Sequence, residues 1–507
     1  MIKKKIVRVL TVAGLLACLA SGCASGGSSV GKEAAADEIK KGGFTVAASC
    51  HDPQIIREGD TYYMFGSHMV GAKCQDLRKW NYFANGVDAA NTLFDNLLTE
   101  PYAAFDFVGK NTDNGYSVWA SNVIYNETMK KYVMYFCTTS SYVKSTLCFA
   151  TADNIEGPYT YVDTILYSGY GKSNISETNL YDVLGKNADI SRYLEYGGYN
   201  NKEWPNCIDP AIFTDADGRM WMNYGSWSGG IFLLEIDPTT GYPIYPVDDK
   251  DADPYYGYRL IGGGHHSAEG PYIQYDAENG YYYLFVSYGD LQSDGGYQIR
   301  QFRSEKPTGP YVDVAGNTLE DQDDHFNYGL KMMGNYTFPS LNYTYMAPGG
   351  QSTFQDDDGK YYITYHQRFD DGTEYHEPRV HQMYTNEDGW FVAAPFATMG
   401  ETLSEKGYKK SDVSGTFYVV NHGTDISSKI REAEAYTFAD GKVTGGEKSG
   451  TYEVKEGTDY ITITLDGVVY KGVLMEMTDE AENSVFCFSA AGDNEETLWG
   501  VQYIQKE

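Results

Sequence analysis

Short stretches in which apolar and polar residues alternate, separated by tight turns, recur along most of the chain. Five segments share one pattern: a polar or acidic opening, a short apolar strand, a turn and a second strand rich in aromatic residues. They begin at Asp52, Ser121, Asp209, Glu269 and Gln351. Alternation with a period of two predicts β-strands, and the Gly, Asn, Asp or Lys residues at the turns favour hairpins.

The spacing of these hairpins predicts the fold. Neighbouring copies lie 70, 88, 62 and 79 residues apart when Tyr63, Val133, Trp221, Tyr283 and Tyr362 are taken as equivalent points. Repeats of this size that contain only strands and turns indicate propeller blades of four strands each. We therefore predict an all-β chain with a five-bladed β-propeller. A β-sandwich is the alternative, but it does not account for five similar hairpins.

A change of pattern near Gly400 marks a second domain. The segments 460–465 and 468–477 alternate around glycine-containing turns, without the aromatic hairpins of the preceding repeats. We predict a propeller over residues 46–398 and a small C-terminal β-barrel or sandwich over 399–507.

The N-terminus predicts export. Residues 1–22 have a basic start, an apolar run and small residues at the end, which is the layout of a signal peptide, and the run is too short to remain as a membrane anchor. The following Cys23 completes a resemblance to the bacterial lipobox, although Ala20 stands where leucine is preferred; a plain signal peptide is the alternative. We expect residues 23–45 to be a flexible tether and the protein to be an extracytoplasmic lipoprotein.

Charge excludes several partners. The chain has 39 Lys and Arg against 70 Asp and Glu, a formal net charge of −31, so a nucleic acid or an anionic lipid surface is disfavoured as a partner. We expect contact with the membrane through the lipid anchor alone, and a monomer. Beyond Cys18 and Cys23, six cysteines show neither paired spacing nor zinc spacing, so no disulfide framework or zinc site is predicted.

Three of the five hairpins open with a carboxylate: Asp52, Asp209 and Glu269. Inner strands of propeller blades start near the central axis, so these side chains should converge although they are far apart in sequence. Converging carboxylates repel one another, and at least one should have a raised pKa. An acid paired with a base is what glycoside hydrolysis requires. For any one of these acids taken alone, a simple turn residue is the favoured interpretation, as for Asp52 and Asp209 beside their prolines. Three acids at the same point of three repeats weaken that interpretation.

Several segments resemble glycoside hydrolase family 43, and most closely its endo-α-1,5-L-arabinanase branch. The matching segments are HDPQIIREGDTYYMFGSH, NCIDPAIFTDADGRMWMNYGSWSGGIF, EGPYI, YHQR and RVHQM with DGWFVAAPF. The resemblance runs from Cys50 to Phe396, and the C-terminal domain resembles the accessory β-domain of longer arabinanases. It implies hydrolysis with inversion of internal α-1,5-L-arabinofuranosyl links in arabinan. It also implies that Asp52 is the general base, Glu269 the general acid, and Asp209 the carboxylate that orients the acid and keeps its pKa raised.

The resemblance implies one calcium ion in the central cavity. A histidine of the fifth blade, His366 here, would be a ligand, with water at most other positions. Calcium usually takes oxygen ligands, so a single imidazole is unexpected, and a histidine that only forms hydrogen bonds in the channel is the alternative.

Other residues are expected to line the sugar cleft. Asn206, Ser226, Trp227 and Ser228 match family segments beside the third carboxylate, and Trp119 and His265 are candidate walls for furanose rings. Packing between blades is the alternative for the aromatic residues. The second blade departs from the family, because the usual Trp-Ala-Pro-acid segment reads Trp119-Ala120-Ser121-Asn122, which puts the nearby subsite in doubt.

Two other functions remain open. An exo-acting α-L-arabinofuranosidase or a β-xylosidase keeps the same carboxylates but closes one end of the cleft, and the insertion between Tyr167 and Trp204 could shape the cleft either way. A non-catalytic propeller lipoprotein that captures glycan is the second alternative. The presence of all three carboxylates favours an enzyme.

Overall fold

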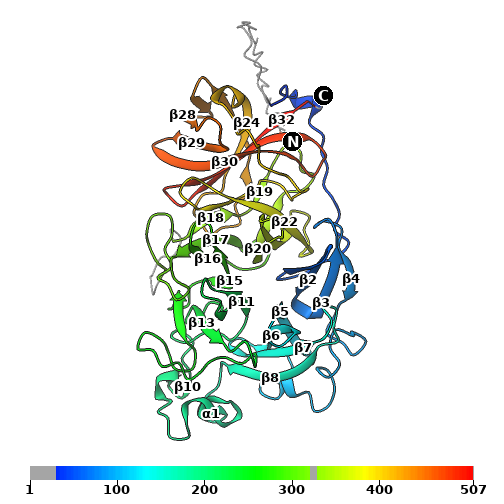
Figure 1. Cartoon of the computed structure of the whole chain (residues 1–507), viewed down its shortest axis with the longest axis vertical. Coiled ribbons are helices and arrows are strands. Elements are labelled where there is room, and N and C mark those ends of the chain that lie inside the picture. The colour runs from blue at the N-terminus through cyan, green and yellow to red at the C-terminus, as the bar shows by residue number, and fades with distance from the viewer. Residues whose placement is uncertain (1–29, 320–327, 506–507) are drawn as a thin grey trace, which may run out of the picture.

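Five antiparallel sheets follow one another along the chain and surround a central axis, and a closed barrel stands above them (Figure 1). The computed structural model describes residues 30–319 and 328–505. The predicted signal peptide over residues 1–22 and the predicted lipid site Cys23 lie outside the described residues. None of the helices in the described ranges is long and apolar enough to cross a bilayer.

Each blade is a four-stranded sheet that runs in chain order from the axis outward. Blade 1 contains β1 (Gln54–Glu58), β2 (Thr61–Gly66), β3 (Val70–Cys74) and β4 (Asn81–Ala84). Blade 2 contains β5 (Ser117–Asn126), β6 (Lys131–Ser141), β7 (Lys144–Ala152) and β8 (Thr160–Tyr167). Blade 3 contains β11 (Ala211–Thr214), β12 (Met220–Tyr224), β13 (Ile231–Ile236) and β14 (Tyr258–Ile261). Blade 4 contains β15 (Ala268–Asp276), β16 (Tyr281–Tyr288), β17 (Gln298–Ser304) and β18 (Leu330–Met333).

Blade 5 has the same four strands plus two that extend its inner edge. It contains β20 (Tyr345–Gln355), β21 (Tyr361–Phe369), β22 (His376–Thr385) and β23 (Phe391–Ala393), extended by β19 (Tyr336–Thr337) and β25 (Arg431–Glu432). The insertion between blades 2 and 3 holds α1 (Leu180–Leu184), β9 (Leu194–Glu195) and β10 (Gly198–Tyr199). The short 3-10 helices are η1 (Ala36–Glu38), η2 (Ser67–Met69), η3 (Ala103–Phe105), η4 (Ile175–Glu177), η5 (Ser191–Tyr193) and η6 (Lys410–Asp412).

The five predicted hairpins are the first two strands of the five blades, so the propeller prediction is confirmed. The five residues taken as equivalent all lie on the second strand of their blade, with Tyr63 opposite Ile56 and Tyr362 opposite Phe354. Each second strand is covered on both faces by neighbouring sheets, and the seven residues from Val133 to Thr139 are all buried. This explains why these strands contain aromatic and aliphatic residues at nearly every position.

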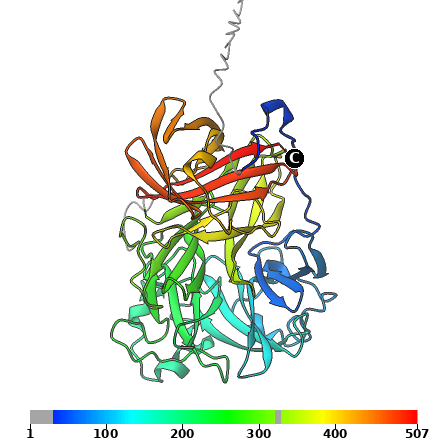
Figure 2. The same cartoon turned by 45° about the horizontal axis from the view of Figure 1, so that its top comes forward.

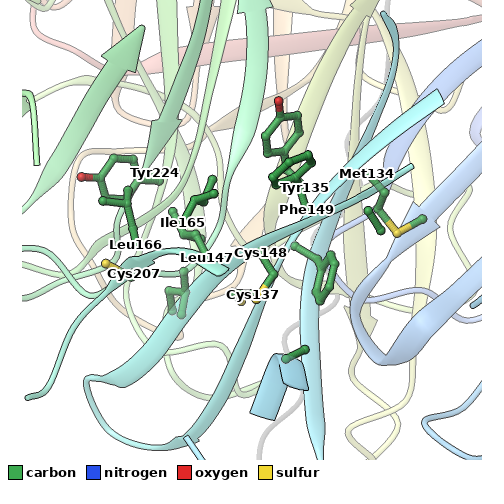
Figure 3. Close-up of a cluster of buried hydrophobic side chains, with 14 of the residues drawn as sticks. Met134, Tyr135, Cys137, Leu147, Cys148, Phe149, Ile165, Leu166, Cys207 and Tyr224 are labelled. Atoms are coloured by element: carbon green, nitrogen blue, oxygen red, sulfur yellow. The ribbon is translucent and has the colours of Figure 1, made fainter. Parts of the chain in front are cut away.

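Packing between blades is shown by the cluster around blade 2 (Figure 3). The rings of Tyr135 and Phe149 lie 5.8 Å apart, and the Tyr135 hydroxyl donates a hydrogen bond to the carbonyl of Gly241 in blade 3, at 2.9 Å. The six cysteines among the described residues are free and buried, and Cys137, Cys148 and Cys207 belong to this cluster. They therefore pack as small apolar side chains.

The C-terminal domain is a closed barrel of eight antiparallel strands, which confirms the barrel and not the sandwich of the two predicted alternatives. Its strands are β24 (Gly415–Asn421), β26 (Glu434–Ala439), β27 (Lys442–Gly445), β28 (Lys448–Val454), β29 (Tyr460–Leu465), β30 (Val468–Thr478), β31 (Ser484–Gly492) and β32 (Thr497–Ile504). The connection between β24 and β26 leaves the barrel, and its β25 pairs in parallel with β19 of blade 5. A strand from the barrel domain thus belongs to a propeller sheet.

The described part of the predicted tether differs from the expectation. Residues 30–45 run from the barrel along the side of the molecule to blade 1 (Figure 2). Glu33 pairs with Ile504 of the barrel, and Gly42 pairs with Leu341 beside blade 5. The amide of Lys40 donates a hydrogen bond to Asn483 at 3.0 Å. These hydrogen bonds hold residues 30–45 against both domains, so this part of the chain is a strap and not a flexible linker.

Candidate active site

The axis of the propeller is a narrow channel built from the same three positions of every blade. A cavity of about 40 Å³ is lined by the triplets 52–54, 120–122, 209–211, 270–272 and 350–352. The first residue of each triplet has a left-handed backbone, with φ of 53°, 47°, 56°, 56° and 58° at Asp52, Ala120, Asp209, Gly270 and Gly350. Such a turn in a non-glycine residue is costly and is tolerated best by Asp and Asn, so the repeat itself selects for a small or acidic residue here.

The sequence comparison of the repeats is off by one residue in three blades, because it starts the hairpins at Ser121, Glu269 and Gln351 whereas the left-handed residues are Ala120, Gly270 and Gly350. Asp52 and Asp209 occupy the left-handed position, but in blade 4 this position is Gly270, so Glu269 precedes it. Asp52 and Asp209 line the channel, whereas Glu269, one residue before the left-handed turn of blade 4, lines a larger cleft. The offset gives the three acids two different environments.

Asp52 is surrounded by groups that favour its ionised form. Its Oδ2 accepts a hydrogen bond from the Ser67 hydroxyl at 2.5 Å and lies 2.8 Å from Nδ1 of His51. Burial raises the pKa of Asp52, but the charge and hydrogen bond of His51 and the Ser67 hydroxyl outweigh it, so the pKa lies below its usual value. This carboxylate is ready to accept a proton at neutral pH.

Asp209 is surrounded by groups that favour its protonated form. Burial, then the neighbouring charges of Asp52 and Glu269, raise its pKa well above the usual value. Its Oδ2 accepts a hydrogen bond from the backbone amide of Gly270 at 3.1 Å. Asp209 therefore fixes the backbone directly after Glu269.

Glu269 is held by three donors. Its Oε1 accepts a hydrogen bond from Tyr297 at 2.7 Å, and its Oε2 accepts bonds from the indole of Trp227 at 2.9 Å and the hydroxyl of Ser226 at 3.1 Å. Burial raises the pKa of Glu269, and the charge of Asp52 raises it further; the three donors lower it without reversing the net upward shift. The site thus separates a carboxylate with a low pKa from a carboxyl with a raised one, as acid–base chemistry requires.

His366 fits the cation that the family resemblance implies. It is fully buried, and neither ring nitrogen has a hydrogen-bond partner among the described residues. Ligand atoms of His51, Asp52 and His366 lie within 4.8 Å of one another, and the rings of His51 and His366 stack at 4.0 Å. Burial lowers the pKa of His366 well below its usual value, so the imidazole is neutral and keeps a lone pair for a metal. A carboxylate with two imidazoles offers both oxygen and nitrogen ligands.

Gly350 leaves the room for this arrangement. A Cβ at this position would overlap Oδ1 of Asp52 and lie 2.8 Å from Nδ1 of His366. The backbone is also left-handed there, with φ of 58°. Both observations require glycine next to the carboxylate and the imidazole.

The cleft above the channel has a volume of about 570 Å³ and extends over blades 2, 3 and 4. Five of the six residues expected to bind substrate line it: Trp119, Asn206, Ser226, Trp227 and His265. The sixth, Ser228, is fully buried behind the wall, and its hydroxyl contacts that of Tyr142 at 3.2 Å. The segments 111–113, 139–142 and 289–292 complete the walls.

Sequence reasoning missed four residues of the site. Tyr142 is 57% exposed in the cleft, with its hydroxyl 2.8 Å from Nδ1 of His265, and Tyr297 contacts Glu269. Both tyrosines lie outside the hairpin pattern, which therefore gave no signal. Ser67 did have a signal, because an aromatic-Gly-Ser triplet ends the second strand in both blade 1 and blade 3. In each triplet the serine contacts an acidic residue: Ser67 contacts Asp52, and Ser226 contacts Glu269. His51 belongs to the segment HDPQIIREGDTYYMFGSH, but the sequence analysis gave it no role of its own.

Comparison with known proteins covers both domains. Residues 183–391 match the glycosyl hydrolases family 43, and residues 395–500 match a C-terminal lipocalin-like domain. The chain is 38% identical over 467 residues to the extracellular endo-alpha-(1->5)-L-arabinanase 2 of Bacillus subtilis, covering 89% of this chain and 92% of that protein. It is 36% identical over 472 residues to the extracellular endo-alpha-(1->5)-L-arabinanase of Thermotoga petrophila, covering 90% and 94%.

A solved structure supports the same relationship. The family 43 glycoside hydrolase of Bacillus licheniformis superposes with a TM-score of 0.79 at 36% identity, over 92% of this chain and 100% of that chain. The similarity thus extends through the propeller and the barrel in one alignment.

Proposed function

The chain belongs to glycoside hydrolase family 43, and on that premise we propose that it is an inverting endo-α-1,5-L-arabinanase. The observation that carries the proposal is the pair of acids with opposite pKa shifts, Asp52 in the channel and Glu269 in the cleft above it. The relatives that span both domains are named as extracellular arabinanases of this type. An extracytoplasmic location follows for this chain.

In the proposed mechanism Glu269 is the general acid and Asp52 is the general base. Protonated Glu269 gives its proton to the glycosidic oxygen as the bond from that oxygen to the anomeric carbon breaks. Ionised Asp52 takes a proton from a water molecule, whose oxygen bonds to the opposite face of the same carbon. The sugar leaves with inverted configuration, Glu269 regains its proton from solvent, and Asp52 releases its proton to solvent. Inverting enzymes keep the two carboxyls about 6.5–9.5 Å apart to leave room for that water.

The surrounding residues prepare this step. Tyr297, Trp227 and Ser226 fix the rotamer of Glu269, and Asp209 fixes the amide that follows it. Ser67 and His51 hold Asp52 in its ionised form. Positioning of this kind supplies much of a hydrolase's rate because little reorganisation remains when charge develops.

We also propose a calcium site at His366, with His51 and Asp52 beside it. Bound there, the ion would supply positive charge that favours the ionised form of Asp52. His366 is the residue whose unpartnered nitrogens and complete burial support this assignment. Its neutral imidazole can bind a cation without first losing a proton.

Replacing Glu269 with Gln tests the mechanism. We expect hydrolysis of debranched arabinan to fall by about 10²–10⁴-fold, the usual contribution of a general acid. Glu278→Gln, in the exposed turn that follows the same strand, is the matched control and should keep full activity. Full activity in the Glu269 variant would show that the assigned acid is wrong.

Product analysis separates endo from exo action within the same reaction. The cleft extends over three blades, which supports binding in the middle of a chain. A ladder of arabino-oligosaccharides early in the reaction is the expected result. Arabinose alone would favour the exo-acting α-L-arabinofuranosidase, and release of xylose from xylan would favour the β-xylosidase. Binding without any product would favour the glycan-capture alternative.

We propose that Cys23 anchors the protein to the membrane surface through a lipid. The motif Leu19–Cys23 supports this, as does the basic and apolar leader before it. Cys23→Ala should move the protein from the membrane fraction to the soluble extracytoplasmic fraction, measured by immunoblot after fractionation. Cys50→Ala, a buried cysteine of the propeller, is the control. Unchanged membrane association of the Cys23 variant would contradict the anchor.

A further inference from the structure

The mouth of the C-terminal barrel is a second large cavity. It has a volume of about 740 Å³, compared with about 570 Å³ for the catalytic cleft. Its floor consists of apolar side chains that point into the barrel, and each is at most 5% exposed: Val419, Tyr436, Leu465 and Leu498. At the other end, Phe417, Phe438, Phe486 and Phe488 fill the barrel. The barrel is therefore closed at one end and open at the other, and barrel mouths are frequent ligand sites.

The wall of this mouth is preformed, because the propeller holds it in place. The connection over residues 423–433 covers one side of the cavity. Gln298 and Lys331 of blade 4 both donate hydrogen bonds to the carbonyl of Asp425, at 3.0 and 2.8 Å. Asn335 donates to the carbonyl of Ser428 at 3.1 Å. A cavity shaped in this way costs a ligand little ordering energy on binding.

The rim presents polar groups in fixed positions. Oε2 of Glu496 accepts hydrogen bonds from the Tyr470 hydroxyl at 2.6 Å and the Asn421 amide at 2.9 Å. Burial raises the pKa of Glu496, but these donors outweigh it and lower the pKa, so the carboxylate is ionised and accepts hydrogen bonds. Arg431 and Asp425, which also line the mouth, form an ion pair.

The lining favours a neutral, polyhydroxylated ligand. Four carboxylates and three cations line the cavity: Asp425, Glu432, Glu434, Glu496, Lys429, Arg431 and Lys448. This balance gives no attraction for an anion, and a wholly apolar ligand would have to desolvate the charged rim. Within the described ranges, the group of three side chains whose geometry could hold a metal ion is His51, Asp52 and His366, none of which lines this mouth. A sugar chain, with apolar C–H faces and hydroxyl edges, matches an apolar floor below a polar rim.

A segment beside the mouth lies against a segment beside the catalytic cleft. A Cβ on Gly296 would lie 2.8 Å from the backbone nitrogen of Ser427, so the 423–433 connection lies directly against the segment that leads to residues 289–292 of the cleft. We infer that the barrel mouth is a second, non-catalytic glycan site that holds an arabino-oligosaccharide segment of the substrate. This inference rests on the proposed function for the identity of the sugar. Two linked sites would retain a polymer better than either site alone.

Calorimetric titration of the inactive Glu269→Gln chain with arabinohexaose tests the inference. We expect two binding sites for each chain. Adding Leu465→Trp, which fills the floor of the mouth, should leave one site. Adding Leu403→Trp instead, at an exposed leucine outside the cavity, should leave two. One site before any change in the mouth, or two sites after Leu465→Trp, would overturn the inference.

A second measurement does not depend on the Leu465 variant, which could fail to fold. Methyl NMR of Val419, Leu465 and Leu498 in the Glu269→Gln chain should show shifts when arabinohexaose is added. Unshifted methyl groups at saturating sugar would overturn the inference. Hydrolysis of arabinan by the wild-type chain tests the proposed function separately. Cleavage without methyl shifts would contradict the second site alone, whereas absence of cleavage would contradict the proposed function.

Discussion

At the scale of single residues, the site depends on small differences between similar acids. Asp52 and Asp209 both sit at left-handed positions, yet their pKa values move in opposite directions because their donors differ. Asp52 has His51 and Ser67, whereas Asp209 has one backbone amide and two acidic neighbours. The identity of the donors thus decides which of the two aspartates has the lowered pKa.

Tyr297→Phe should move the basic limb of the pH profile. The Tyr297 hydroxyl lowers the pKa of Glu269, so removal of the hydroxyl raises that pKa. In the proposed mechanism Glu269 must be protonated. We expect the basic limb of kcat/KM to shift to higher pH and the value at the optimum to fall by about tenfold, as for one lost hydrogen bond to a charged group. The control is Tyr283→Phe, whose hydroxyl contacts Gly389 instead. An unmoved basic limb would contradict this role of Tyr297.

At the scale of the strand, sequence reasoning reached the hairpins but not the bulges within them. Alternation placed Tyr63 and its four equivalents on the second strands, because burial on both faces leaves a strong pattern. The register shift between Glu269 and Tyr272 leaves no such pattern, since one extra residue in a strand changes direction without changing composition. Sequence reasoning found the three acids and expected a raised pKa among them, but not that Glu269 faces a different cavity from Asp52 and Asp209.

The loops and the barrel set a second limit on what the sequence predicts. Tyr142 and Tyr297 reach the site from segments whose position depends on the surrounding fold. The choice between barrel and sandwich depends on the pairing of β24 with β32, which are some eighty residues apart and have no short-range signal. Burial patterns predict elements, whereas contacts between distant elements decide the final arrangement.

Gly350→Ala tests the inner-strand bulge. A methyl group there would overlap Asp52 and crowd His366, and the backbone has φ of 58°, so we expect a loss of about 1–3 kcal/mol in the free energy of unfolding together with most of the activity. The matched control is Gly359→Ala, at the turn of the same hairpin, with φ of 85° and no atom near its added methyl. The control carries the backbone strain alone. Both variants are compared by activity assay and by thermal unfolding. An equal loss of activity in the two would contradict the specific role of Gly350.

At the scale of the molecule, the two domains share elements and are not merely adjacent. β25 leaves the barrel and pairs with β19, and the strap over residues 30–45 pairs with both the barrel and the region of blade 5. The buried side chain of Asn335 connects them further, because it accepts a hydrogen bond from Ala347 at 2.7 Å and donates one to Ser428. We expect the domains to unfold together.

Asn335→Ala should weaken that coupling. Loss of two buried hydrogen bonds should lower the free energy of unfolding by about 1–3 kcal/mol and separate one calorimetric transition into two. Asn279→Ala, at an exposed turn of blade 4, is the control and should keep a single transition. A single transition at an unchanged temperature in the Asn335 variant would show that the other contacts suffice.

The repeated left-handed turn has a consequence for how such a site can diversify. The residue before it occupies the same backbone position in each blade, and the five blades place there His51, Trp119, Ile208, Glu269 and Gly349. One position thus carries an imidazole, an indole, an aliphatic chain, an acid and, at Gly349, no side chain at all, because a Cβ there would overlap the ring of Tyr297. A substitution at this position in any of the four blades that carry a side chain there alters the chemistry of the site while the hydrogen-bonded ladder beneath stays the same. The propeller backbone and the side chains at this repeated position can therefore evolve separately.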